Sequence, residues 1–151
     1  MPGRRASAEI YSSVLQHLIT KAAEVGVELS NCDWDVMSDF EIAERNAFRT
    51  VMPNCVVYGC GFHYTQALMK NLTDHGLKLL YQRDPNFRHY IRKYMMLMML
   101  PPALVKTSWA ELTKLSTTVV PNEYKQQFSN WITYHKTTWM DGTYDIEDWN
   151  R

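Results

Sequence analysis

The sequence predicts a helix-rich α/β fold, in which short parallel strands with flanking helices are followed by an all-helical part. Apolar residues recur at three- and four-residue steps over most of the 151 residues, which is the spacing of amphipathic helices. Two short runs, near residues 34–38 and 55–59, are instead rich in β-branched and aromatic residues and alternate with helices. Strands separated by a helix pair in parallel. We therefore expect an α/β part over residues 1–76, a helical part over 77–139 and an irregular acidic tail over 140–151.

The α/β part begins with a helix that ends at Gly26, since glycine commonly follows the last turn of a helix. The spacing of its apolar residues predicts one buried face. The side chains expected on that face are Ile10, Val14, Leu18, Ala22 and Val25.

Two strands and two further helices complete the α/β part. The first strand ends at Ser38, and a helix then runs from about Phe40 to the stop at Pro53. The run CVVYG at residues 55–59 predicts the second strand, and a helix follows it as far as Gly76. The order strand, helix, strand implies a small parallel sheet.

Proline and apolar spacing mark three helices in the helical part. Pro85 and Pro102 each suit the first turn of a helix, and a third helix runs over residues 121–135. The residues expected inward are Phe87, Ile91, Tyr94, Met95 and Met98 in the first, Val105, Trp109, Leu112 and Leu115 in the second, and Tyr124, Phe128, Trp131 and Ile132 in the third. The neighbouring Met96 and Met99 are also expected in the core.

The composition excludes several classes of protein. Sixteen basic residues balance 16 acidic ones, so no bulk charge attracts DNA, RNA or anionic lipid. Five Trp, nine Tyr and five Phe argue against a disordered chain. The most apolar run, Met95 to Leu100, is far shorter than the roughly 20 residues of a membrane-spanning helix, so no membrane partner is expected. Three cysteines, an odd and sparse set, indicate an intracellular protein, and the lack of a glycine-rich phosphate loop argues against a nucleotide cofactor.

The segment Ser38-Asp39-Phe40-Glu41 is the first candidate site, because it joins the end of a strand to a helix. In open α/β sheets, ligands bind at the carboxyl ends of the strands. Asp39 and Glu41 could therefore hold a divalent metal ion through carboxylate oxygens. Alternatively, Ser38 and Glu41 form a capping box that satisfies the free N–H groups of the helix.

Two further groups of residues could carry a function. Cys60 and His63 are spaced to lie on one face of an opening helical turn, where both could bind zinc, although two ligands make half a structural site. Arg88, Arg92 and Lys93 belong to a basic group that could contact phosphates. The alternative for the basic group is a solvated helix face opposite the apolar stripe.

In this order, these segments resemble the catalytic domain of Mutator-like element (MULE) transposases. Residues 39–68, DFEIAERNAFRTVMPNCVVYGCGFHYTQAL, match the family's DFE-x-A helix, its short strand and its G-C-x-F-H-[YF]-x-Q-A block. The resemblance continues through residues 80–105 and ends at the pair Trp149-Asn150. It covers nearly the whole chain from about residue 10.

The resemblance implies a ribonuclease-H-like core with a helical insertion, and a DDE transposase that cleaves and joins DNA with Mg²⁺ or Mn²⁺. Asp39 matches the second of the three metal-binding acids of that family, and Cys60 and His63 match its Cys-x-x-His signature. DNA is the implied partner, with Arg88, Arg92 and Lys93 as possible contacts, and the nucleus is the implied location.

The sequence also departs from the family pattern, since no residue matches the first or the third acid. We therefore expect a fragment of such a transposase, cut on both sides, or a protein derived from one, and in either case a chain that is inactive alone. The alternative is a non-enzymatic module recruited to bind DNA or a protein. A two-stranded sheet with open edges also predicts self-association.

Overall fold

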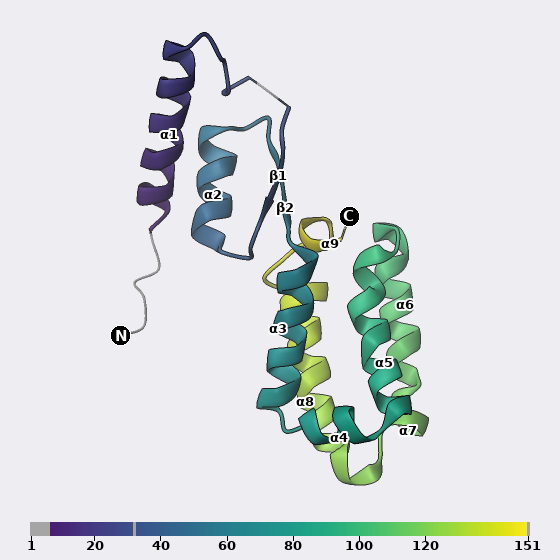
Figure 1. The fold of residues 1–151 in the computed structure, drawn as a ribbon. Coiled ribbons are helices and arrows are strands. Elements are labelled where there is room, and N and C mark those ends of the chain that lie inside the picture. Colours follow the sequence, from purple (N-terminus) through teal and green to yellow (C-terminus); the bar gives the residue numbers. More distant parts are fainter. Residues whose placement is uncertain (1–6, 32, 151) are drawn as a thin grey trace, which may run out of the picture. The chain divides into compact units, whose positions relative to one another are not determined.

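The computed structural model describes residues 7–31 and 33–150, which form two compact units that divide after Cys60. The first unit contains α1 (Ala8–Glu24), β1 (Asp35–Ser38), α2 (Ile42–Val51) and β2 (Val56–Gly59), as Figure 1 shows. The strands are parallel, with Asp35 opposite Val56 and Ser38 opposite Gly59. The predicted helix-rich α/β fold with short parallel strands is confirmed.

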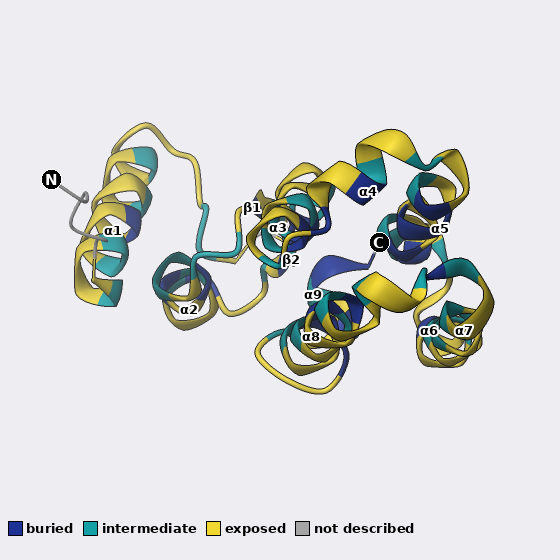
Figure 2. Cartoon of the chain, turned by 90° about the horizontal axis from the view of Figure 1, so that it is seen from below, coloured by how far each residue is buried: buried dark blue, intermediate teal, exposed yellow. Residues whose placement is uncertain are grey.

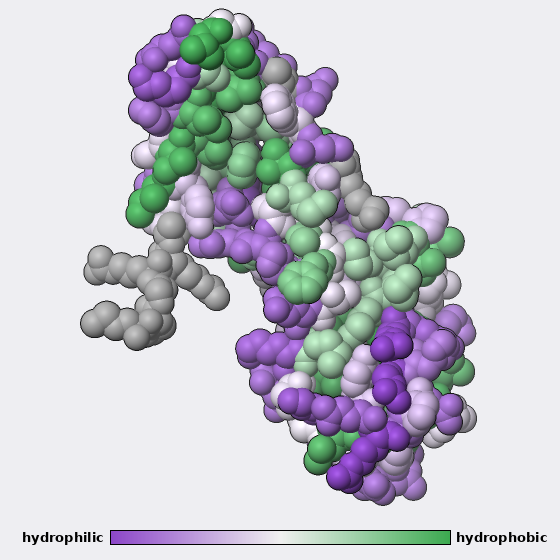
Figure 3. Space-filling view, in the orientation of Figure 1, coloured by the Kyte–Doolittle hydropathy of each residue, from purple (hydrophilic) through white to green (hydrophobic). Residues whose placement is uncertain are grey.

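The core of the first unit lies between α1 and α2, but α1 turns a different row inward from the one predicted. Leu15 is buried with Ala47 and Met52, and Tyr11 and Ile19 pack beside them. Of the expected row, Ala22 is half-buried. The other members, Ile10, Val14, Leu18 and Val25, are each more than half exposed. Figure 3 shows the resulting hydrophobic surface along α1. Both rows are apolar, and the inward one also lets the Tyr11 hydroxyl donate to Glu41 Oε2 over 2.9 Å.

A buried arginine joins α2 to the sheet. Arg45 is 2% exposed, its Nη2 donates to the carbonyl oxygen of Val57 at 3.3 Å, and its guanidinium lies 5.9 Å from the centre of the Phe40 ring. A Cβ atom at position 59 would collide with that same ring. Because Gly59 has no side chain, the Phe40 ring can pack directly against the end of β2.

The second unit is all helical. Its longer helices are α3 (Gly61–Asp74), α5 (Pro85–Met95), α6 (Pro102–Lys114) and α8 (Lys125–His135). Shorter segments connect them: α4 (Lys78–Arg83), η1 (Met96–Met99), α7 (Ser116–Val119), η2 (Asn122–Tyr124), η3 (Lys136–Met140) and α9 (Ile146–Trp149). In the part of the chain that the structure describes, no helix combines the length and apolarity needed to cross a bilayer.

Helix α3 belongs to this second unit, whereas the sequence interpretation kept residues 61–76 with the α/β part. Its buried side chains, Tyr64, Leu68 and Leu72, face the other helices of the unit. The indole N–H of Trp131 donates to the Leu68 carbonyl oxygen at 3.2 Å and so fixes α3 to α8. Figure 1 shows these two helices side by side.

Two predictions about the core of the second unit are wrong. Met96 and Met99 are mostly exposed, because the chain tightens into the 3-10 turn η1 and there turns Leu97 inward instead. Leu115, which follows the last residue of α6, is also exposed. Of the rest of the stripe predicted from Pro85, Phe87, Ile91 and Tyr94 are buried as expected, and Met95 and Met98 are half-buried.

The acidic tail, predicted to be irregular over residues 140–151, contains one short helix and packs on the helical unit over the residues described, which end at Asn150. Asp145 and Asp148 form a capping box that starts the short helix α9. Trp149 stacks on Tyr64 at 4.7 Å between ring centres, and its indole N–H donates to the Trp139 carbonyl oxygen at 2.9 Å. Asn150 is buried, and its Nδ2 donates to the Leu97 carbonyl oxygen at 2.7 Å. The tail therefore closes the helical unit.

The centre of the helical unit is the imidazole ring of His135, which is completely buried. It belongs to α8, whose buried residues are dark blue in Figure 2. The Trp109 indole N–H, which can only donate, lies 3.1 Å from His135 Nδ1. Nδ1 is therefore the acceptor and Nε2 carries the proton, which it donates to the Tyr64 hydroxyl over 3.1 Å. That hydroxyl donates in turn to the Tyr94 carbonyl oxygen. One neutral ring thus joins residues of α3, α5, α6 and α8.

We predict that the helical unit loses stability in mild acid because of this ring. Burial lowers the pKa of His135 to about 3, whereas a histidine in the unfolded chain has a pKa near 6.5. Between these pH values His135 is protonated in the unfolded chain and neutral in the folded chain. The free energy of unfolding should therefore fall by about 1.4 kcal/mol per pH unit as the pH drops below about 6.5.

Urea unfolding followed by tryptophan fluorescence measures this loss, because Trp109, Trp131, Trp139 and Trp149 all lie in the helical unit. The variant His89→Gln, which changes an exposed histidine, is the control and should keep the same slope. A free energy of unfolding that stays constant from about pH 6.5 to 5 would show that His135 accepts a proton in the folded state.

Candidate functional site

Asp39 lies directly after the carboxyl end of β1 and is exposed. Its Oδ1 accepts a hydrogen bond from the backbone N–H of Glu41 at 2.9 Å. The Ser38 hydroxyl donates to the Asp39 carbonyl oxygen at 2.8 Å and makes no bond to α2. The predicted capping box is therefore wrong. Helix α2 begins at Ile42, so Ser38 lies too early in the chain to cap it, and Asp39 binds the turn that leads into the helix.

Three carboxylates surround this turn. Glu41 accepts the Tyr11 hydroxyl, and that hydrogen bond raises the pKa of Tyr11. Burial raises the pKa of Glu44, and the nearby charges of Asp39 and Glu41 add to the effect. This end of β1 is thus electronegative, which is a property that attracts cations.

A complete metal site is nevertheless not formed there. Across residues 7–31 and 33–150, no three side chains of His, Cys, Asp or Glu come together in a way that could hold a metal ion. Mg²⁺ requires several oxygen ligands in near-octahedral geometry. The residues present do not fit the divalent ion that the sequence suggested for Asp39.

Cys60 and His63 do not form a zinc site with other residues either. Cys60 is the last residue of the first unit, where its N–H donates to the Ser38 carbonyl oxygen at 2.8 Å. His63 is exposed in the first turn of α3, and its ring meets the Phe62 ring edge-on at 5.6 Å. Within the described ranges neither residue belongs to a group of three or more metal-binding side chains. A structural zinc site needs four such ligands.

The predicted basic residues lie together on α5 and form what we call the basic face: Arg88, Arg92 and Lys93. Arg92 and Lys93 are exposed and Arg88 is half-buried. In the part of the chain that the structure describes, no carboxylate forms an ion pair with any of the three. The positive charges near the end of α5 also favour the helix dipole, so they stabilise the helix even without a ligand.

Next to the basic face lies a groove that the sequence did not predict, between α5–η1 and α6, with a volume of about 450 Å³. Its apolar lining comes from Met96, Leu97, Leu100, Leu112 and Leu115. The remaining lining residues are His89, Arg92, Lys93, Thr107, Ser108 and Glu111. The sequence interpretation placed the methionines in the core, and for that reason it left no room for a surface groove.

The chain has no match among protein-family profiles, curated proteins or solved structures. The candidate sites are therefore defined by their geometry alone. Of these, the turn at Asp39 has one exposed carboxylate engaged in local structure. The α5 surface has cations that form no ion pair with any described residue, beside an apolar groove. The second arrangement is the better suited to bind a partner.

We predict that Asp39 contributes to folding through its acceptor oxygen and not through its charge. Asp39→Ala removes the acceptor for the Glu41 N–H and should destabilise the chain by about 1 kcal/mol. Asp39→Asn keeps an acceptor oxygen in the same place and should cost less than about 0.5 kcal/mol. Thermal unfolding followed by circular dichroism measures both variants. Equal losses in the two would mean that the negative charge is what stabilises the turn.

Proposed function

We propose that this chain derives from the catalytic region of a MULE-type DDE transposase and that it binds DNA without cleaving it alone. In this proposal the first unit is a remnant of the ribonuclease-H-like core, and α3 to α9 correspond to its last helix and to the helical insertion. The nucleus is the location that follows from this origin.

The position of Asp39 supports the proposed origin. Asp39 matches the second acid of the family, and it follows β1 at its carboxyl end, beside the parallel strand β2, which is where open α/β sheets bind ligands. Two other matched motifs follow in the family's order: Cys60 and His63 lie at the start of α3, and the Trp149-Asn150 pair packs in the helical unit. The order of these motifs along the chain is the observation that carries the proposal.

Catalysis by this chain alone is not part of the proposal. The parent reaction needs three acids around the metal ions, and Asp39 matches one of them. A single exposed carboxylate binds Mg²⁺ weakly, because such sites combine several carboxylates with the phosphates of the substrate. No catalytic step is therefore assigned to Asp39 in this chain.

The genomic DNA on either side of the reading frame tests the proposed origin. We expect it to encode, in some frame, sequence similar to the rest of a MULE-type catalytic domain, including the two acids that this chain does not match. Flanking DNA without any such sequence would contradict descent from a local transposase copy.

The basic face supports DNA binding as the retained activity. Arg88 and Arg92 are four residues apart on one helix and so project to the same side, and Lys93 follows Arg92 on the side of the groove. Phosphate groups are bound by this kind of local cluster, even where the chain as a whole carries no net charge. Because the three residues form no ion pairs among the described residues, no intramolecular partner has to be displaced.

We predict that duplex DNA binds at the basic face at low salt. The double variant Arg88→Ala/Arg92→Ala removes two phosphate contacts and should reduce the slope of log affinity against log salt by about 2. The matched control, Lys78→Ala/Arg83→Ala, removes two exposed cations from α4 and should leave that slope unchanged. Electrophoretic mobility shifts over a salt series measure both.

The same samples also test the absence of cleavage. With Mg²⁺ or Mn²⁺ added, we expect supercoiled plasmid to stay intact. The lack of any mobility shift at low salt would contradict DNA binding. Metal-dependent nicking that Asp39→Asn abolishes would contradict the view that this chain is inactive alone.

A further inference from the structure

The groove beside the basic face combines an apolar interior with a positively charged rim. Leu97 is buried at its base, whereas Met96 and Leu115 are mostly accessible on its walls. A pair of exposed apolar walls around a buried base is the shape into which an apolar side chain of a ligand fits. The groove lies entirely within the helical unit.

The charges around the groove do not cancel. Arg92 and Lys93 line the α5 side and form no ion pair among the described residues. The carboxylate on the α6 side belongs to Glu111, and Lys114 neutralises it at 2.7 Å. The rim is therefore positive, and a ligand with negative charges next to its apolar groups complements it.

The walls of the groove are held in place from behind. The Tyr90 hydroxyl donates to the Leu112 carbonyl oxygen at 2.7 Å, and the hydroxyls of Tyr94 and Thr113 lie 3.4 Å apart. Both bonds join α5 to α6. Because the two helices are fixed before a ligand arrives, binding costs little reorganisation of the groove itself.

We propose that this groove binds an acidic amphipathic helix of a partner protein. Apolar side chains of that helix enter the groove, and its carboxylates pair with Arg92 and Lys93. The lining from His89 to Leu100 follows the chain for about 16 Å at helical rise, which accommodates a helix with apolar residues at i, i+4 and i+7. The flexible thioether of Met96 adapts to the shape of the side chain that enters.

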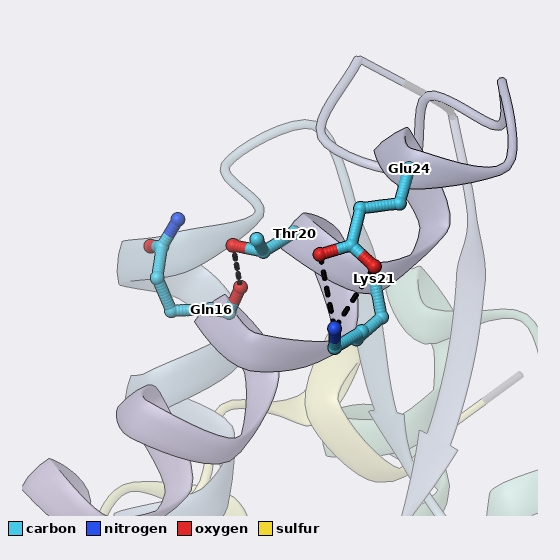
Figure 4. Close-up of polar contacts among 4 residues, drawn as sticks. All are labelled: Gln16, Thr20, Lys21 and Glu24. Carbon is cyan, nitrogen blue, oxygen red and sulfur yellow. Dashed lines mark hydrogen bonds and ion pairs between the residues drawn. The ribbon is translucent and has the colours of Figure 1, made fainter.

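Other occupants fit these observations less well. Duplex DNA would use the cations but not the apolar interior, since the phosphate backbone is its outermost surface. The α1 helix of a second copy has an exposed apolar row, but Glu9 and Glu24 are its only acids. Lys21 already neutralises Glu24 at 2.9 Å (Figure 4). The proposal does not depend on a transposase origin or on DNA binding.

Fluorescence anisotropy with a labelled synthetic peptide tests the proposal on the full chain. The peptide has about 15 residues, with leucines at i, i+4 and i+7 flanked by glutamates, and a second peptide carries lysine in place of each glutamate. We expect the acidic peptide to bind at least about tenfold more tightly than the basic one, because like charges at the rim repel. Raising the salt concentration should weaken the acidic peptide.

Two matched pairs of variants locate the binding site. Leu115→Asp should weaken the acidic peptide at least about tenfold, and Leu79→Asp should leave it unchanged. Both leucines are exposed, at 45% and 56%, and Leu79 lies on α4, away from the groove. Likewise Lys93→Glu should weaken the peptide about fivefold, while the exposed Lys78→Glu should not. Unchanged circular dichroism would show that the variants fold.

Arg88 and Leu115 separate this proposal from DNA binding, because Arg88 does not line the groove and Leu115 is not part of the basic face. Arg88→Ala should weaken the binding of DNA and leave the binding of the peptide unchanged. Leu115→Asp should weaken the binding of the peptide and leave the binding of DNA unchanged. Failure of the acidic peptide to bind saturably, or equal losses with Leu115→Asp and Leu79→Asp, would overturn the proposal. So would a dimer in solution that Leu115→Asp dissociates, because a second copy would then occupy the groove.

Discussion

The helical unit depends on a single imidazole ring that is buried without charge. His135 on α8 accepts a hydrogen bond from Trp109 on α6 and donates one to Tyr64 on α3, whose hydroxyl reaches the backbone of α5. Four helices therefore meet at one residue. In a protonated ring, Nδ1 would also carry a hydrogen, and this N–H would face the Trp109 indole N–H, so that two donors would meet. The buried positive charge would then lack an acceptor at Nδ1, which is costly. Neutrality of His135 is for this reason a condition of the fold.

The aromatic side chains around His135 also position the two helices, α5 and α6, that carry the basic face and the groove. Tyr94 packs edge-on against Trp131 at 5.2 Å, and the Tyr90 and Tyr94 hydroxyls hold α5 to α6. The same two helices carry the basic face and the walls of the groove on their outer sides. A rigid interior thus fixes the spacing between the exposed Leu115 and cations that form no ion pair with the residues described. This property makes the α5 surface a candidate for binding. In the first unit, by contrast, the exposed carboxylate of Asp39 is engaged in local structure through its hydrogen bond with the Glu41 N–H.

Local signals in the sequence predicted most of the elements, because they act within a few residues. Gly26 and Gly76 adopt positive φ and end helices, and Pro85 and Pro102 begin them. The sequence did not predict which apolar row of a helix is buried, because that choice depends on the element against which the helix packs. In α1 two adjacent apolar rows compete, and the pairing of Tyr11 with Glu41 favours the one that periodicity did not select. The family resemblance gave Trp149-Asn150 no structural role, yet these residues close the helical unit.

The candidate sites differ in the same way, since one depends on neighbouring residues of a single helix and the other depends on how two helices pack. The basic face was predictable, since its three cations lie within two turns of one helix. The groove was not, because it depends on η1 turning Met96 outward and on the way the next helix, α6, packs against α5. Nitrogen-15 NMR of the His135 ring at about pH 5 shows whether the ring is neutral in the folded chain. We predict a neutral ring with the proton on Nε2, and a ring protonated on both nitrogens would mean that the four helices do not depend on an uncharged His135.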